Sequence, residues 1–338
     1  MLLFNHCCPN LATTKFFNML SKHINLKNFT LTLSLLLLIF ILTSVDWGLI
    51  AQHSQKLNTE SFTAIILIFF VSIFFRSVRF SLSLPDKYHP DFLPMYYISM
   101  QHNFYLSILP ARLGELSYIK LLSENLKIPK EYSIVSIISC RLYDLVVLAV
   151  FGIYSLTYVL DNEHKIIQIT LSFMVVFSIL VFLFLNQLIA ILKKTFITLS
   201  KYTTKSLAKR ISDNININNK NVANFTFQKH VKLLVTTSIT WVLMSINYGV
   251  VLHMFEVKFS YPELILIVSI VNLSNLIPIQ TFGGFGVKEA ALISAFMAMG
   301  MILSKATALA VISRLVLYLI PLVISTLFLF VNIRSDKH

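Results

Sequence analysis

Two apolar stretches of the chain carry charged side chains beside residues that break helices. Residues 110–115 read Pro-Ala-Arg-Leu-Gly-Glu, and residues 283–289 read Gly-Gly-Phe-Gly-Val-Lys-Glu, shortly after Pro278. The glutamate of each stretch is followed, after 26 and 25 residues, by an arginine in a long apolar run, Arg141 and Arg314. A charge at the centre of a membrane helix costs about 2.5–3.5 kcal/mol on insertion scales. These charges therefore need partners or a ligand, and the two glutamates are the natural partners.

The interrupted helices predict a site for phosphate. Proline lacks an N–H and leaves carbonyls of the preceding turn unpaired, whereas glycine lets the backbone turn sharply and approach a ligand closely. The helix that restarts after the turn presents free N–H groups and a positive dipole end, which suits a phosphate. We predict that a lipid phosphate is bound by Arg112, Arg141, Gly283, Gly284, Gly286 and Arg314. The predicted charge partners are Glu115, Asp144 and Glu289, and the predicted helix breaks are Pro110 and Pro278.

Structural roles compete with this interpretation. Arg141 and Asp144 are three residues apart and could form an intrahelical ion pair with no ligand. His102 could be a hydrogen-bonded packing residue or a proton carrier. Asn272 and Asn275 could tie helices together, as amides do in membranes. The sequence leaves both roles open for each of these residues.

The sequence contains no evident cluster of catalytic or metal-binding residues. Its three cysteines offer neither metal-ligand spacing nor a disulfide framework. We therefore predict no catalytic residue, no metal and no cofactor, although Glu115 with arginines could serve phosphate chemistry. A transporter is favoured over an enzyme.

Long apolar segments must hold these residues in place. Of the 338 residues, 56% are apolar and 13% are charged, and the mean hydropathy is +0.76. A helix needs about 20 apolar residues to cross the hydrocarbon core. Runs of that length occupy residues 29–49, 62–84, 132–160, 166–192, 231–255 and 304–333. Buried helices of a soluble protein are the alternative, which the low share of charged residues disfavours.

The distribution of basic residues predicts the orientation of these spans. The net charge is +13, and residues 193–232 hold nine lysines and arginines against one aspartate. Positive charge near span ends marks the cytoplasmic side. We therefore place this basic loop, the N-terminal tail at 1–28 and the C-terminus in the cytoplasm. Because aromatic residues do not interleave with the bases, nucleic acid is not a predicted partner.

Two hairpin segments, at 94–122 and 262–300, then enter the membrane from opposite faces. Each has a polar cluster, a proline, a small-residue turn and a glutamate that opens a new helix. The pattern predicts one transmembrane domain at 29–333, with repeat halves at about 62–160 and 231–333. Many secondary transporters use such broken helices around a midplane site. The predicted fold is an all-α polytopic membrane protein with six long spans and two broken or re-entrant helical hairpins that form an inverted repeat.

The paired motifs resemble those of the lysylphosphatidylglycerol synthase transmembrane-region family, also described as flippase-like membrane proteins. The resemblance rests on residues 110–115, on Pro278 with the glycine turn at 283–289, and on Arg141 and Arg314. It extends over roughly residues 31–331. Because the family is largely prokaryotic, the resemblance implies a multi-pass protein of an inner membrane. The aminoacyl-transferase domain of two-domain synthases is not expected, since the sequence stops at His338.

The resemblance also implies a function in lipid handling. We expect a translocase, or flippase, for an anionic phospholipid or an isoprenoid-linked lipid, with the membrane lipid's anionic headgroup as its ligand. The alternative is a non-transporting accessory or scaffold protein in envelope lipid or glycolipid synthesis. Its protein partner would then be a lipid-modifying enzyme or a glycosyltransferase.

Overall fold

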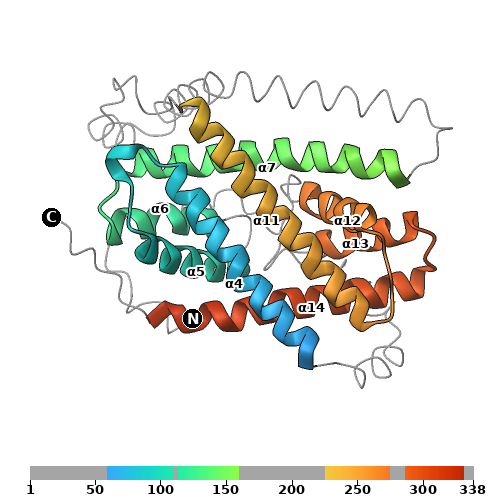
Figure 1. The fold of residues 1–338 in the computed structure, drawn as a ribbon. Coiled ribbons are helices and arrows are strands. Elements are labelled where there is room, and N and C mark those ends of the chain that lie inside the picture. The colour runs from blue at the N-terminus through green and yellow to red at the C-terminus, as the bar shows by residue number, and fades with distance from the viewer. Residues whose placement is uncertain (1–58, 110–112, 160–224, 275–285, 331–338) are drawn as a thin grey trace, which may run out of the picture.

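A computed structural model describes residues 59–109, 113–159, 225–274 and 286–330 of the chain (Figure 1). These residues form eight α-helices and two short 3-10 helices, and they contain no β-strand. The α-helices are α4 (Thr59–Leu82), α5 (Phe92–Ile108), α6 (Leu113–Asn125), α7 (Lys130–Val159), α11 (Phe227–Met254), α12 (Tyr261–Leu273), α13 (Val287–Ala298) and α14 (Leu303–Leu327). The 3-10 helices are η1 (Asp86–Tyr88) and η4 (Phe328–Phe330).

Four of the described helices, α4, α7, α11 and α14, are long and apolar enough to cross a membrane. They lie on four of the six predicted spans, and most of their ends fall within a few residues of the ends of the apolar runs. The predicted spans at 29–49 and 166–192 lie outside the described residues. The all-helical architecture is therefore confirmed for the described part of the chain, and the count of six spans stays a prediction.

The outward faces of the four long helices are apolar. Leu67 on α4, Val150 on α7, Val235 on α11 and Val323 on α14 are all exposed. Large apolar patches are rare on soluble monomers, whereas such faces suit contact with lipid tails. A helix also pairs its backbone groups within its own segment, which a bilayer requires.

The short helices form two pairs on opposite sides of a central pair of long helices. Helices α4 and α11 pack side by side through the middle, while α7 and α14 run along the two edges (Figure 1). The pair α5–α6 occupies one end of the bundle, and α12–α13 occupies the other (Figure 1). Helix α5 packs against α14, and α12 packs against α7. Each short pair therefore contacts a long helix from the other half of the chain.

Contacts between helix ends show which ends share a side of the bundle. Lys229 Nζ, near the start of α11, donates to the carbonyl of Leu84, just after α4, at 2.6 Å. Tyr88 of η1 packs against Tyr132 at the start of α7. The end of α14 lies on the same side (Figure 1). Helices α4 and α14 therefore run toward this side of the bundle, and α7 and α11 run away from it.

Two apolar clusters anchor the short pairs. The larger cluster joins α4, α7, α11, α12, α13 and α14 around the fully buried Ile267 and Phe296. The smaller one joins the end of α4 to α5, α6 and α7 around Tyr118 and Leu122, which are also fully buried. Because both pairs are packed in this way, the side chains between them have fixed positions.

Candidate functional site

A cavity of about 370 Å³ lies inside the bundle, and all eight described α-helices contribute to its wall. Sites for small ligands in proteins span about 300–1,000 Å³. The wall mixes apolar side chains with five cationic ones, Arg76, Arg79, Arg141, Lys288 and Arg314. Because an apolar surrounding screens charge poorly, these groups concentrate positive charge along the cavity wall.

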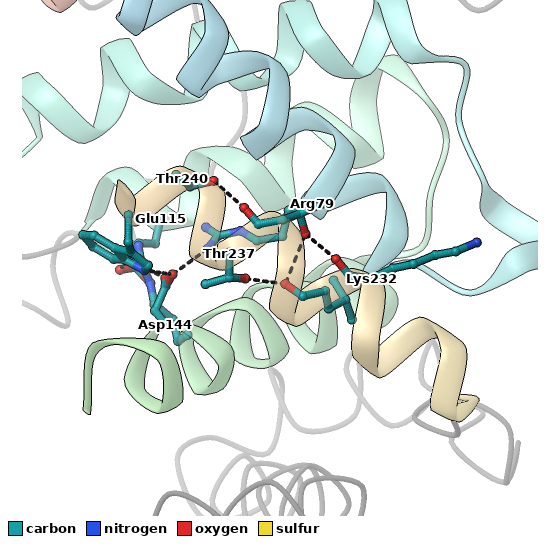
Figure 2. A network of polar contacts seen from close by, with 10 residues as sticks. Arg79, Glu115, Asp144, Lys232, Thr237 and Thr240 are labelled. Atoms are coloured by element: carbon teal, nitrogen blue, oxygen red, sulfur yellow. Dashed lines mark hydrogen bonds and ion pairs between the residues drawn. The ribbon is translucent and has the colours of Figure 1, made fainter. Parts of the chain in front are cut away.

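Asp144 of α7 is the centre of a polar network in this wall. Its Oδ1 accepts hydrogen bonds from Arg79 Nη1 at 2.5 Å and from Trp241 Nε1 at 3.0 Å. The side chains of Arg79 and Asp144 are only 6% and 7% exposed. Figure 2 shows the Arg79 side chain extending toward Asp144. One carboxylate therefore joins α4, α7 and α11, and it neutralises a buried guanidinium.

Threonine hydroxyls of α11 beside this network bond within their own helix. Thr237 Oγ1 donates to the carbonyl of Leu233 at 2.7 Å, and Thr240 Oγ1 donates to that of Thr236 at 2.8 Å (Figure 2). Such bonds to the preceding turn satisfy a hydroxyl inside an apolar helix. Thr240 lines the cavity, and its hydroxyl hydrogen-bonds to its own helix and not to the carboxylate of Asp144.

Arg141 links Asp144 to α6. Its Nη1 lies 3.3 Å from Asp144 Oδ2, and its Nη2 lies 2.9 Å from Glu115 Oε1. The structure therefore contains both the intrahelical pair and the contact to the glutamate of the first motif. The Arg141 side chain is 46% exposed, which makes it the most accessible arginine of the network. Its guanidinium has structural partners and still lines the cavity.

Gly114 determines the close approach of α5 and α6. A Cβ at this position would lie 2.6 Å from Leu106 Cα and 2.7 Å from the Tyr105 carbonyl oxygen. A larger residue would therefore push the two backbones apart. Glu115 directly follows this contact, so the glycine of the first motif helps to position the carboxylate that binds Arg141.

The second motif builds a buried ion pair at the start of α13. Gly286 has a φ of 93°, which favours glycine, and its N–H donates to Glu289 Oε2 at 2.5 Å. The other oxygen, Oε1, accepts a hydrogen bond from Arg314 Nε at 3.0 Å. Glu289 and Arg314 are buried. The carboxylate of Glu289 therefore both caps α13 and neutralises Arg314.

The motifs, the long apolar helices and the central charges agree with a known family. Residues 29–325 match the family described as lysylphosphatidylglycerol synthase TM region. The chain belongs to this family. A search of curated proteins finds no match to the chain.

Membership in the lysylphosphatidylglycerol synthase TM-region family makes this a membrane protein of lipid handling or synthesis. The matched residues include every residue of the cavity wall, since the last of these in the sequence is Pro321. The four long apolar helices lie in the same range except for the last two residues of α14. The family resemblance predicted from the motifs is therefore confirmed.

The residues predicted to bind phosphate in this family member lie in different places. Arg141 and Arg314 line the cavity. Gly286 lies at the start of α13, where its N–H is bonded to Glu289. The other predicted phosphate-binding residues, Arg112, Gly283 and Gly284, lie outside the described part of the chain, and their roles stay predictions. The predicted helix breaks Pro110 and Pro278 lie outside it as well.

His102 and Asn272 line the cavity and have partners nearby. His102 is buried, its Nδ1 lies 3.1 Å from Ser117 Oγ, and its ring packs against Tyr118. Asn272 Nδ2 donates to the carbonyl of Val268, in its own helix, at 2.7 Å. The contacts of His102 are those of a hydrogen-bonded packing residue.

Sequence reasoning missed Arg76, Arg79, Asn103 and Trp241 as residues of this site. Arg76 and Arg79 lie six and three residues before the end of α4, where basic residues are common as charges that flank a span. Their spacing was an available signal, because residues three apart share a helix face. No local pattern links Arg79 or Trp241 to Asp144, since these partners are 65 and 97 residues away in sequence.

Proposed function

We propose that the protein binds the phosphate of an anionic phospholipid or isoprenoid-linked lipid in the central cavity and moves the headgroup between leaflets. The charge of the cavity wall carries this proposal. Among the described residues, five cations line the wall, and three of them, Arg79, Arg141 and Arg314, contact carboxylates. The wall therefore concentrates cationic side chains around one cavity, and the family supports a lipid as the source of the anion.

An anionic headgroup would be attracted to these cationic side chains. Two unit charges 4 Å apart attract by about 4 kcal/mol at an effective dielectric constant of 20. The planar fork of a guanidinium matches two phosphate oxygens, and Arg141 and Arg314 present such groups to the cavity. The lipid tails would remain in the bilayer beside the apolar outer faces of the helices. Rocking of one half of the protein against the other would expose the cavity to each leaflet in turn.

We propose that the halves at about 62–160 and 231–333 form an inverted repeat. The matched packing of α5 on α14 and of α12 on α7 supports this arrangement. So do the two glutamate–arginine contacts of 2.9 and 3.0 Å, one in each half. An experimental structure should place Pro110 and Pro278 near the midplane, related by a pseudo-two-fold axis in the membrane plane. A continuous straight helix through either proline would refute the repeat.

We propose that both termini and the basic segment at 193–232 lie in the cytoplasm of an inner-membrane protein. The support is the asymmetry of positive charge along the sequence. In intact cells, a cysteine at Lys205 should be protected from an impermeant thiol reagent, whereas cysteines at Asn162 and Lys258 should react. Reaction at position 205 from outside would overturn this orientation and the inversion that depends on it.

Leaflet-specific labelling in reconstituted vesicles tests transport directly. Vesicles would carry fluorescent phosphatidylglycerol or phosphatidylcholine, and an impermeant reductant would bleach only the outer leaflet. We expect the protein to make inner-leaflet phosphatidylglycerol accessible faster than in protein-free vesicles, with a smaller effect on phosphatidylcholine. Arg141→Gln should slow this exchange, and Lys232→Gln, which removes an exposed charge, is the matched control. Equal rates with and without protein would refute transport and favour an accessory protein that works with a lipid-modifying enzyme or glycosyltransferase.

A further inference from the structure

Arg76 differs from the other arginines of the cavity wall in the kind of partner it has. Arg79, Arg141 and Arg314 contact carboxylates at 2.5, 2.9 and 3.0 Å. Arg76 Nη1 instead donates to the amide oxygen of Asn103 at 3.0 Å. Within the part of the chain that the structure describes, Arg76 forms no ion pair with a carboxylate.

The position of Arg76 along α4 makes this arrangement costly without a ligand. The residue lies six positions before the end of α4 at Leu82, which is about 9 Å along the helix axis. A charged residue at such a depth in a membrane helix generally faces a cavity or a charged partner and marks a functional site. Arg76 faces the cavity, and a headgroup from the leaflet nearest this end could reach it.

Asn103 holds Arg76 through a hydrogen bond that an anion can replace. Its Oδ1 accepts the bond from Arg76, and its Nδ2 lies 3.1 Å from Ser325 Oγ on α14. The bond to Asn103 has one ionised partner, whereas a phosphate oxyanion brings a second charge and can accept two parallel N–H bonds from one guanidinium. A phosphate oxygen beside the guanidinium would therefore compete successfully with the neutral amide.

We propose that Arg76 also binds the phosphate oxyanion, exchanging the Asn103 amide for a phosphate oxygen. This inference rests on the proposed function. It adds a residue that binds the phosphate, Arg76, and the residue that Arg76 contacts when no ligand is bound, Asn103. Because Asn103 also joins α5 to α14, the exchange links occupation of the cavity to a contact between the two halves. The shared chemistry is that of a phosphate anion, which a lipid headgroup or free phosphate could supply.

Ligand-dependent thermal stabilisation of the purified full-length protein in mixed micelles tests this proposal. The probes are phosphatidylglycerol, phosphatidylcholine and inorganic phosphate, and the melting temperature without added ligand checks the fold of each variant. We expect Arg76→Gln to raise the apparent Kd for phosphatidylglycerol by about 10- to 100-fold, because bonds to a charged group are lost. Arg76→Lys should have a smaller effect, since it keeps the charge, and Lys232→Gln should match the unaltered protein.

A variant of the competing amide gives a prediction of opposite sign. Asn103→Ala removes the partner that phosphate must displace, so we expect binding of phosphatidylglycerol to become roughly three- to tenfold tighter. Unchanged or weaker binding would overturn the exchange. This test holds even if Arg76→Gln fails to fold.

The remaining outcomes separate this inference from the proposed function. If phosphatidylglycerol does not stabilise the unaltered protein, the lipid site itself is refuted. If it stabilises the unaltered protein and Arg76→Gln equally, only the role of Arg76 is refuted. If inorganic phosphate stabilises the protein as strongly as phosphatidylglycerol does, the ligand is a free anion and the assignment to lipid is wrong.

Discussion

Replacing Asp144 with asparagine tests whether one carboxylate holds the cationic wall of the cavity together. The substitution keeps the size of the side chain and leaves an amide oxygen that can still accept the hydrogen bond of Trp241, now 3.0 Å from Asp144 Oδ1. It removes the charge that neutralises Arg79, whose side chain is 6% exposed. The effect of Asp144→Asn should therefore come mainly from an arginine left buried without its partner.

The magnitude follows from the exposure of each pair. Removing one partner of a buried ion pair costs about 3–5 kcal/mol, and the Arg79–Asp144 pair meets that condition. The pair with Arg141 adds little, because that side chain is 46% exposed and keeps Glu115 at 2.9 Å. We expect Asp144→Asn to lower the free energy of unfolding by about 3–5 kcal/mol. The matched control Glu115→Gln should lower it by about 0–1 kcal/mol, the range for exposed pairs.

Reversible unfolding in mixed micelles with increasing dodecyl sulfate measures these differences. The double variant Arg79→Gln with Asp144→Asn completes the cycle, and it should recover at least about 1 kcal/mol relative to the sum of the single changes. Equal losses for Asp144→Asn and Glu115→Gln would contradict the reasoning. So would strict additivity in the cycle, because it would mean that Arg79 and Asp144 contribute independently.

Three further expectations concern the two motifs. Glu289→Gln and Arg314→Gln should each destabilise the protein by about 3–5 kcal/mol in the same unfolding assay, and their combination should recover part of that loss. If Arg314 binds lipid phosphate, the double change should not restore lipid binding, and wild-type binding in that variant would exclude this role. Arg314→Lys should impair lipid binding more than stability, because lysine keeps the charge but loses the planar fork. Gly114→Ala should lower the free energy of unfolding by about 1–3 kcal/mol. Gly152→Ala should be nearly neutral, because its Cβ would lie 3.7 Å from the nearest side-chain atom. Equal effects of the two changes would refute the argument that Gly114 allows the close approach of α5 and α6.

The long helices were predictable because the bilayer imposes a length and a composition. Residues 132–160 contain few charges, and α7 occupies nearly the same range, Lys130–Val159. The partners of Glu115 and Glu289 were also predictable, because each motif is followed by an arginine at nearly the same distance in the sequence. The structure brings these glutamates to Arg141 and Arg314.

The cavity wall was harder to predict because its contacts join distant segments. Arg79 and Asp144 belong to helices with no shared motif, and their contact depends on how α4 packs across the bundle. The side chain of Asn103 bonds to Arg76 and Ser325 on other helices, and no sequence motif links these three residues. Hydrophobic periodicity gives the apolar face of a helix, but it does not give the partner of a polar group on that face.

The position of Asp144 in the sequence has a consequence for how the protein is made. Arg79 leaves the ribosome 65 residues before its carboxylate partner, which is roughly 3 to 13 s at ordinary elongation rates. During that interval the guanidinium of Arg79, three residues before the end of α4, has yet to meet the carboxylate of Asp144. Trp241 follows Asp144 after another 97 residues. The contact of Arg79 with Asp144 therefore forms only after α7 has been synthesised, and the network is complete only once α11 has followed.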